Sequence, residues 1–272
     1  MLVTVFRLLS RLPLRWLQRL GALLGLLVYA FPGRYRRRLR ENVAQAGYDG
    51  AAFARRAAAQ TGIMMLETAW VWFRPRDARA LVRNSHHERL QRIIAEGRPI
   101  LFFTPHLGNF ELAARIAAQY APIRVLYRPP RQAALRPLVD ASRQNDGVLT
   151  APANRQGLRQ LLRALRQRQM VGILPDQVPA EGEGAWADFF GRPAYTMTLP
   201  ARLAADPEVV VLAAVCERLP AGQGWQVHLE DIHDRPGESP EAQAAWINAI
   251  MRRLIERCPE QYLWSYNRYK QP

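Results

Sequence analysis

The segment Pro99–Glu111 reads PILFFTPHLGNFE and combines an apolar run, a turn and the start of a helix. The run Ile100–Phe103 has the composition of a strand that is buried on both faces, as strands of parallel sheets are. Gly108 supplies the turn, and Asn109 is a residue type that caps the first turn of a helix. The segment therefore predicts a strand, a turn and a helix of an α/β fold, with His106 in the turn.

The turn and the helix start carry two residues of acid–base chemistry. Residues five apart in one continuous helix point about 140° apart, so the pair acts together only if His106 precedes the helix and Glu111 lies in its first turn. A general base needs a pKa near the working pH and a fixed ring, and a nearby carboxylate favours both. We therefore interpret His106 as a candidate general base and Glu111 as its partner. A structural histidine beside a glutamate that favours the helix dipole is the alternative.

Apolar runs and helical patterns alternate from Pro99 onward. The runs are Ile100–Phe103, Ile123–Tyr127, Val148–Ala151, Val171–Leu174 and Val209–Val215, and the helical patterns cover Glu111–Gln119, Gln132–Gln144 and Arg155–Arg168. Such alternation is typical of βαβ units. Outside it we expect helix from about Tyr48 to Leu90, an antiparallel or edge strand at Trp225–Leu229 and a closing helix at Glu241–Arg257. The predicted fold class is α/β, with a mostly parallel central sheet flanked by helices.

Composition narrows the choice of partners. The chain has 272 residues, a formal net charge of +15 and a pI of about 11.0, so an acidic partner or surface is expected. Lys270 is the only lysine, and arginine, which binds phosphate and carboxylate through its planar fork, carries the remaining positive charge. The sequence has no helix-turn-helix, zinc-ligand or basic–aromatic motif, so nucleic acid is not the expected partner. Cys216 and Cys258 stand apart in apolar contexts and are expected to be buried thiols.

The N-terminal segment combines a basic stripe with apolar residues. The stripe repeats every four residues and covers about 120° of a helix surface; its members are Arg7, Arg11, Arg15 and Arg19. The uncharged run that follows, Leu20–Phe31, is shorter than the roughly 20 residues needed to cross a bilayer. Its basic flanks argue against translocation and favour a helix lying in, or dipping into, an anionic cytoplasmic leaflet. A buried N-terminal helix of the fold is the alternative. We expect a membrane-anchoring helix at residues 1–33 and the main domain at residues 34–272.

The motif within Pro99–Glu111 resembles that of a known enzyme family. HLGNFE after a strand resembles the His-x4-Asp/Glu motif of membrane glycerolipid and lipid A acyltransferases, and its glutamate variant resembles the late acyltransferases of lipid A biosynthesis. Further segments resemble that family in order, over most of the chain from about Arg34: Arg38 with Asn42, Tyr127-Arg128-Pro129, Arg143 with Gly147, Pro175-Asp176-Gln177, Phe189-Phe190-Gly191-Arg192-Pro193-Ala194, and Pro259–Trp264. The tail departs from the family pattern, because Ser265-Tyr266-Asn267-Arg268 stands where a His-Arg-Arg-type run is usual.

The resemblance implies an enzyme of lipopolysaccharide biosynthesis at the cytoplasmic face of the inner membrane. The acyltransferase domain, residues 34–272, would move a fatty acyl chain from an acyl carrier protein thioester to a hydroxyl of a lipid A precursor. His106 would remove the hydroxyl proton, and Glu111 would fix the histidine tautomer and stabilise the imidazolium. A thioester is already activated, so neither a metal, a cofactor nor a covalent acyl-enzyme is expected.

Several strand ends are expected to meet at the site. Ligands of parallel sheets gather at the carboxyl ends of the strands, and His106, Arg128 and Asp176 each follow such an end. Arg128, Asp176, Gln177 and, through the resemblance alone, Arg143 are the candidates for substrate binding or oxyanion stabilisation. Phe189-Phe190-Gly191 is expected in an exposed loop, either anchored in the core or forming part of an acyl-chain pocket or lid.

Three other functions are open at this point. Glycerophospholipid acyltransferases resemble a His-x4-Asp pattern with a Phe-Pro-Glu-Gly-type phosphate motif, whereas this chain has Leu174-Pro175-Asp176-Gln177 at the comparable strand end. A phosphatidylinositol-mannoside acyltransferase shares the larger superfamily. A catalytically silent protein that binds membranes through its basic N-terminal helix is the alternative from another class.

Overall fold

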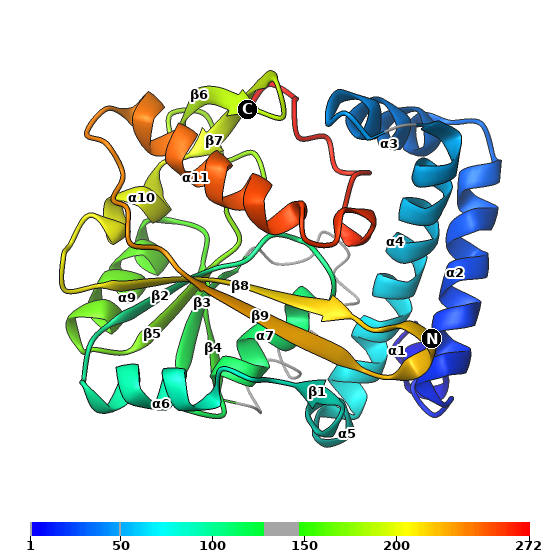
Figure 1. Cartoon of the computed structure of the whole chain (residues 1–272), viewed down its shortest axis with the longest axis horizontal. Coiled ribbons are helices and arrows are strands. Elements are labelled where there is room, and N and C mark those ends of the chain that lie inside the picture. The colour runs from blue at the N-terminus through cyan, green and yellow to red at the C-terminus, as the bar shows by residue number, and fades with distance from the viewer. Residues whose placement is uncertain (1, 49, 128–146) are drawn as a thin grey trace.

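The computed structural model of the chain describes residues 2–48, 50–127 and 147–272 (Figure 1). Within these residues, seven strands form the main sheet in the order β1-β9-β8-β2-β5-β3-β4. All neighbouring strands are parallel except β8 and β9, which confirms the predicted α/β class and the antiparallel strand at Trp225. The strands are β1 Val82–Arg83, β2 Ile100–Phe103, β3 Ile123–Tyr127, β4 Val148–Pro152, β5 Met170–Ile173, β8 Val210–Arg218 and β9 Trp225–Asp231.

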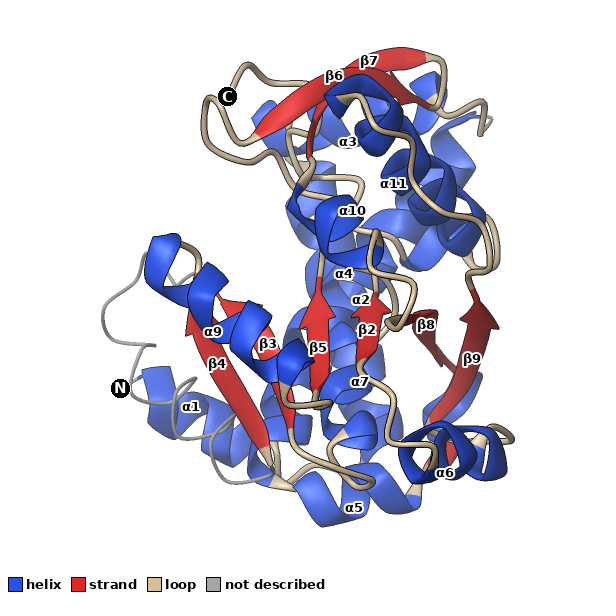
Figure 2. Cartoon of the chain, turned by 90° about the vertical axis from the view of Figure 1, so that its left-hand side faces the viewer, coloured by secondary structure: helices blue, strands red, loops and turns tan. Residues whose placement is uncertain are grey.

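Helices cover both faces of this sheet. On one face lie α6 (His87–Ala95) and α7 (Phe110–Ala117), and on the other lie α9 (Arg155–Arg166), α10 (Leu199–Ala204) and α11 (Pro240–Ile255). Because alternate residues of a strand point to opposite faces, Ile100 and Phe102 of β2 pack under α6 and α7, whereas Leu101 and Phe103 pack under α9 and α11. Figure 2 shows β4, β3, β5 and β2 side by side with their arrowheads at one edge. The residues that follow β2 and β5 therefore meet at that edge.

Five helices make up the N-terminal part: α1 (Leu2–Leu9), α2 (Leu14–Ala30), α3 (Arg34–Gln45), α4 (Gly50–Phe73) and α5 (Pro75–Ala80). Helix α2 lies along α4 at the outer edge of the molecule (Figure 1). The two helices touch backbone to backbone, because a Cβ placed on Gly21 would lie 2.7 Å from the Ile63 Cα, and one on Gly62 would lie 2.1 Å from the Gly21 carbonyl oxygen. Small residues on both helices allow this close approach.

The face of α2 that points away from α4 is apolar and exposed. Leu23, Leu27, Val28 and Phe31 are between 48% and 72% exposed. Among the described residues, no helix on its own combines the length and the apolar character of a membrane span; α2 and α3 do so only when taken together, and they meet at 98°.

The structure corrects three sequence expectations. The single N-terminal helix expected to carry the arginine stripe is broken, because α1 ends at Leu9 and α2 begins at Leu14, so the four arginines do not lie on one helix. The strand β1 and the loop before α6 interrupt the helix expected up to Leu90. Residues expected in an exposed loop around Phe189 form an antiparallel hairpin of β6 (Gly184–Phe189) and β7 (Arg192–Met197). Phe189 and Phe190 are buried in the core, where the Phe190 ring packs at 5.6 Å from that of Trp264. The expected exposed loop was wrong, whereas the alternative in which the aromatic pair is anchored in the core is confirmed, because the hairpin folds onto the C-terminal tail.

Candidate active site

The turn between β2 and α7 presents His106 at the carboxyl edge of the sheet. The His106 carbonyl accepts a hydrogen bond from the Leu263 amide at 3.1 Å, and the Asn109 amide donates to the Cys216 carbonyl at 2.8 Å. The Asn109 side chain accepts from the Leu112 amide, so the predicted N-cap of α7 is confirmed. The C-terminal tail and β8 therefore fix the backbone around His106, together with the N-cap of α7.

Glycine is the residue type that fits at position 108 of this turn. Its φ is +59°, and a Cβ at this position would lie 2.1 Å from the Cys216 carbonyl oxygen. Residues other than glycine rarely adopt this left-handed conformation, and the contact with β8 leaves no space for a side chain. The close approach of turn and strand sets the distance of His106 from the sheet.

Asp176, in the loop after β5, binds His106 at two points. One carboxylate oxygen lies 2.7 Å from the His106 Nδ1, and the other accepts a hydrogen bond from the His106 amide at 2.8 Å. Burial alone would raise the pKa of Asp176, but the charge and hydrogen bonds of His106, together with the charge of Arg268, hold that pKa below its ordinary value. The ionised carboxylate accepts hydrogen bonds only, so the Nδ1 of His106 carries the proton.

In this tautomer the lone pair of the ring lies on the His106 Nε2, which is therefore the acceptor nitrogen. The side-chain amide nitrogen of Gln177 lies 3.1 Å from this atom and donates to it. The His106 side chain is 18% exposed, whereas that of Asp176 is 2% exposed. A carboxylate behind a histidine with one accessible nitrogen is the arrangement of a general base. The structure thus brings together three residues that the sequence singled out: His106, Asp176 and Gln177.

The C-terminal tail forms the wall behind Asp176. Burial and the charge of Asp176 raise the pKa of Tyr262 well above its ordinary value, so its hydroxyl stays protonated and donates to Asp176. Arg268 is buried and donates to the Tyr195 carbonyl at 2.7 Å, to Thr196 and to Asn248. Asn42 of α3 donates to two carbonyls of the tail, those of Trp264 and Tyr266, at 2.7 and 2.8 Å. Tyr262 and Arg268 were not predicted as site residues, because both lie far from the segment Pro99–Glu111 in the sequence.

Glu111 lies in the first turn of α7, as predicted, and is buried. Its carboxylate lies 3.2 Å from the guanidinium of buried Arg115, and the Trp72 indole donates to it at 3.3 Å. From the resemblance, Glu111 was expected to fix the tautomer of His106, and the structure places the carboxylate of Asp176 against the His106 Nδ1. The catalytic contribution of Glu111 stays a prediction. Arg128 and Arg143, together with the helix expected at Gln132–Gln144, lie outside the described residues.

A second buried carboxylate joins the N-terminal helices to the same turn. Glu67 of α4 pairs with Arg218 at the end of β8 at 2.7 Å, and neither side chain is more than 3% exposed. Gln18 of α2 donates to Glu67 at 2.7 Å, and Arg218 donates to the Gly108 carbonyl at 3.4 Å. This network connects α2 and α4 to the turn that carries His106.

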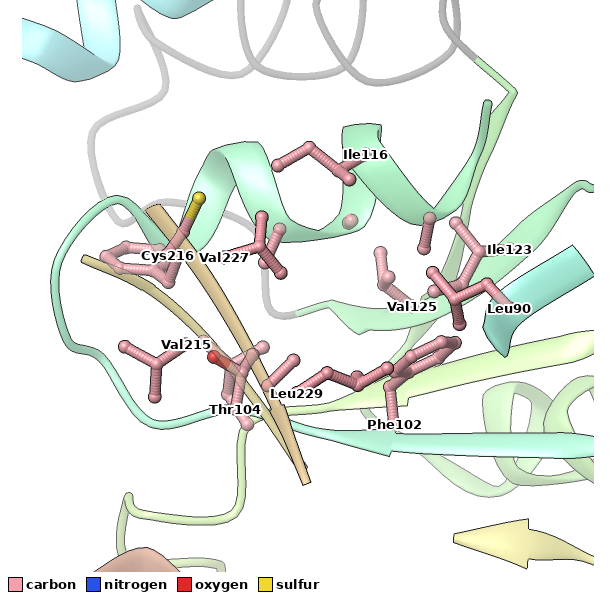
Figure 3. A pocket seen from close by; sticks show the side chains of 17 residues that line it. Leu90, Phe102, Thr104, Ile116, Ile123, Val125, Val215, Cys216, Val227 and Leu229 are labelled. Atoms are coloured by element: carbon pink, nitrogen blue, oxygen red, sulfur yellow. The ribbon is translucent and has the colours of Figure 1, made fainter. Parts of the chain in front are cut away.

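An apolar cavity opens beside the histidine, between the sheet and α7 (Figure 3). It contains about 600 Å³ of space not filled by atoms, part of which is open to solvent. Among the described residues that line it, Thr104 alone carries a hydroxyl group. The Phe110 ring lies 4.8 Å from the His106 ring and also lines the cavity. The other lining residues are Leu90, Phe102, Ala113, Ala114, Ile116, Ala117, Ile123, Val125, Gly172, Leu174, Ala214, Val215, Cys216, Val227 and Leu229.

Known proteins resemble this chain over most of its length. A sequence model of the family described as bacterial lipid A biosynthesis acyltransferase matches residues 1–271. The lipid A biosynthesis lauroyltransferase of Escherichia coli (strain K12) is 27% identical over 284 residues, which cover 98% of this chain and 90% of the relative. The lipid A biosynthesis palmitoleoyltransferase of the same strain and a lipid A biosynthesis acyltransferase of Shigella flexneri are each 26% identical over 218 residues, which cover 77% of this chain and 68% of each relative.

Proposed function

This chain belongs to the bacterial lipid A biosynthesis acyltransferases, and we propose that it transfers a fatty acyl chain from acyl carrier protein thioester to a hydroxyl of a lipid A precursor. The observation that carries the proposal is the His106–Asp176 pair, with one accessible ring nitrogen, beside an apolar cavity. The acceptor is the free 3-hydroxyl of an acyl chain already attached to the glucosamine disaccharide.

The reaction requires a single proton acceptor. His106 Nε2 removes the proton of the acceptor hydroxyl while the oxygen attacks the thioester carbonyl. The tetrahedral intermediate then collapses, the carbon–sulfur bond breaks, and the thiolate leaves and takes up the proton from the imidazolium. Asp176 is a positioning residue, because it holds Nδ1 protonated and its negative charge stabilises the imidazolium formed during the reaction.

Gln177 must move when the acceptor binds. Its amide nitrogen lies where a hydroxyl would have to approach Nε2, at 3.1 Å. Once displaced, the same N–H group is placed to donate to the oxyanion that forms on the thioester carbonyl. Glu111 adds a second negative charge near the imidazolium, and Arg128 and Arg143 bind substrate phosphates or the oxyanion in this proposal.

The apolar cavity accommodates the acyl chain of the donor. Its walls contain almost no polar group, and its rim at Phe110 contacts the ring of the general base. An acyl chain seated there brings its thioester carbon toward His106, as a largely apolar ligand site with few polar groups does.

The N-terminal helices attach the enzyme to the cytoplasmic face of the inner membrane in this proposal. The apolar face of α2 is exposed, and so are the four arginines of the stripe: Arg7 in α1, Arg11 between the two helices, and Arg15 and Arg19 in α2. Apolar burial in the lipid and attraction of arginine to anionic headgroups act together at such a surface. The basic charge of the chain also suits the acidic carrier protein.

An assay with the purified full chain tests the function. A tetraacylated glucosamine disaccharide precursor is incubated with a mixture of acyl carrier protein thioesters, and products are weighed by mass spectrometry. We expect a product that is heavier by one acyl group, absent with His106→Ala. Acylation of lysophosphatidate or of a phosphatidylinositol mannoside instead would assign a different acceptor, and no transfer to any acceptor by folded protein would exclude an enzyme of this kind. The two E. coli relatives are named for different acyl groups, so the assay, and not sequence similarity, identifies the acyl group that this chain transfers.

A further inference from the structure

The floor of the apolar cavity is built by three parallel strands, β2, β5 and β3. We call the residues that are paired across these strands in register, and that face the cavity, one level. Register pairs Phe102 of β2 with Gly172 of β5, and Gly172 with Val125 of β3. All three line the cavity, and Thr104 and Leu174, two residues nearer to the strand ends, line it above them. One such level corresponds to about 6.6 Å along a strand. The cavity therefore descends along the sheet, away from the edge that carries His106.

In the middle level, Gly172 has no side chain, whereas its neighbours Phe102 and Val125 do. Glycine in the interior of a central strand weakens the strand, and it occurs where another group must approach the backbone closely. A Cβ at this position would lie 3.1 Å from the Val125 Cγ1 and 3.3 Å from the Ile123 Cδ1. Both distances are shorter than ordinary Cβ contacts, so a side chain at position 172 would press against these two lining residues and take up part of the cavity.

The lowest level ends the cavity. Ile100, Met170 and Ile123 are paired across the same three strands and are at most 2% exposed. Ile123 lines the cavity and Leu90 of α6 lies close to it, as the labelled side chains show (Figure 3). An acyl chain that extends past Gly172 would therefore meet the branched side chains of Ile123 and Leu90.

We infer that Gly172 sets the depth of the cavity and thereby the length of the acyl chain that the enzyme transfers. The inference rests on the proposed function of the cavity as the acyl-chain site. A side chain added at position 172 shortens the usable cavity by about one level. A smaller side chain at position 123 lengthens it. Side chains at these two positions therefore select chain length in opposite directions.

Competition among saturated acyl thioesters of increasing length tests the inference. Gly172→Ala and Gly172→Val are expected to lower the kcat/KM ratio of the longest to a shorter accepted chain by about tenfold or more, because differences of a methylene or two in an apolar pocket have effects of this size. Ile123→Ala is expected to shift the ratio toward longer chains. Ala213→Val is the matched control, because it enlarges a buried side chain on the opposite face of the same sheet; its chain-length profile should stay that of the wild type.

Displacement of a fluorescent fatty acid by unlabelled fatty acids gives a second readout that does not need transfer. Unchanged length preference in the Gly172 and Ile123 variants, with transfer intact, would overturn the inference and leave the proposed function standing. A shifted binding preference without any transfer would support the inference for the cavity and contradict the proposed function. If both Gly172 variants fail to fold, an unchanged preference in Ile123→Ala overturns the inference by itself.

Discussion

Asp176 holds His106 at two points, through the ring nitrogen at 2.7 Å and the backbone amide at 2.8 Å, although the two residues are 70 positions apart in the chain. The double contact fixes both the ring orientation and the tautomer of the histidine. Since β2 and β5 are neighbours in the sheet, the loops that follow them meet at one edge, and this adjacency makes the contact possible.

Removal of the base should stop the reaction without unfolding the protein. We expect His106→Ala to lower kcat by a factor on the order of 10²–10⁴, because the acceptor hydroxyl then loses its proton acceptor. Steady-state kinetics and the melting temperature are measured on the same preparation. His233→Ala, at an exposed histidine, is the control and should retain the wild-type rate. A folded His106→Ala variant with a near-normal rate would contradict the mechanism.

Asp176 should contribute stability that depends on pH. Its pKa in the folded state lies below the ordinary value of 3.8, so the ionised form stabilises the fold fully above that pH. The contribution is lost as the pH falls from there through the folded-state pKa. Urea unfolding of wild type and Asp176→Asn at a series of pH values should show a difference in unfolding free energy that shrinks in this acidic range. A difference that is the same at every pH would show that the carboxylate charge is not the stabilising feature.

Asp176→Asn should also separate positioning from structure. Without the carboxylate, the Nδ1 proton is no longer preferred, so kcat is expected to fall by a factor on the order of 10²–10⁴ even where the variant is folded. The pH at which kcat/KM rises is expected to move downward, since the imidazolium loses its stabilising charge. Asp77→Asn, which alters an exposed carboxylate of α5, is the control and should leave both quantities unchanged. A wild-type pH profile in Asp176→Asn would remove Asp176 from the proposed role.

Gly108→Ala should damage both the fold and the rate. The added methyl group meets the Cys216 carbonyl, and the residue must still adopt a positive φ, so we expect destabilisation by more than about 1 kcal/mol together with a displaced His106. Gly182→Ala is the matched control, because Gly182 has a φ of +78° with no atom within 4 Å of an added Cβ. Equal unfolding free energies of the two variants would show that the contact with β8 is unimportant.

The buried pair of Glu67 and Arg218 should be strongly coupled. Glu67→Leu leaves a buried guanidinium without its counter-ion, and breaking such a pair costs about 3–5 kcal/mol. The double variant Glu67→Leu/Arg218→Met removes both charges and should be less destabilised than Glu67→Leu alone, as urea unfolding would measure. Glu256→Leu breaks an exposed pair with Arg252 and should cost no more than about 1 kcal/mol. Additive effects in the double variant would argue against coupling.

Attachment to lipid should depend on the arginine stripe. Changing Arg7, Arg11, Arg15 and Arg19 together to Gln is expected to weaken binding to anionic vesicles, since each basic residue near such a surface contributes roughly 1 kcal/mol, and the difference should fade at high salt. The matched control changes four exposed arginines of α9, Arg155, Arg159, Arg163 and Arg166, and therefore removes the same charge elsewhere. Equal losses of vesicle co-sedimentation in both variants would mean that net charge, rather than the stripe, drives binding.

Local patterns predicted the parts of the fold whose causes are local. The apolar run Ile100–Phe103 became β2, Asn109 caps α7, and the predicted start of α9 at Arg155 agrees with the structure. The hairpin of β6 and β7 was missed, because its aromatic turn was interpreted as part of an exposed loop. Only packing against the C-terminal tail decides that Phe189 and Phe190 are buried.

Strand periodicity, capping and turn chemistry act over a few neighbouring residues, so the α/β class, the turn that holds His106 and the residue types of the site could be predicted from the sequence. The contacts of Asp176 with the His106 Nδ1 and of Gln177 with Nε2, and the cavity that runs past Gly172, arise only when the strands pack together. These relationships depend on which strands become neighbours. That choice follows from how the whole chain buries its apolar faces, and residues distant in sequence contribute to it as much as adjacent ones do.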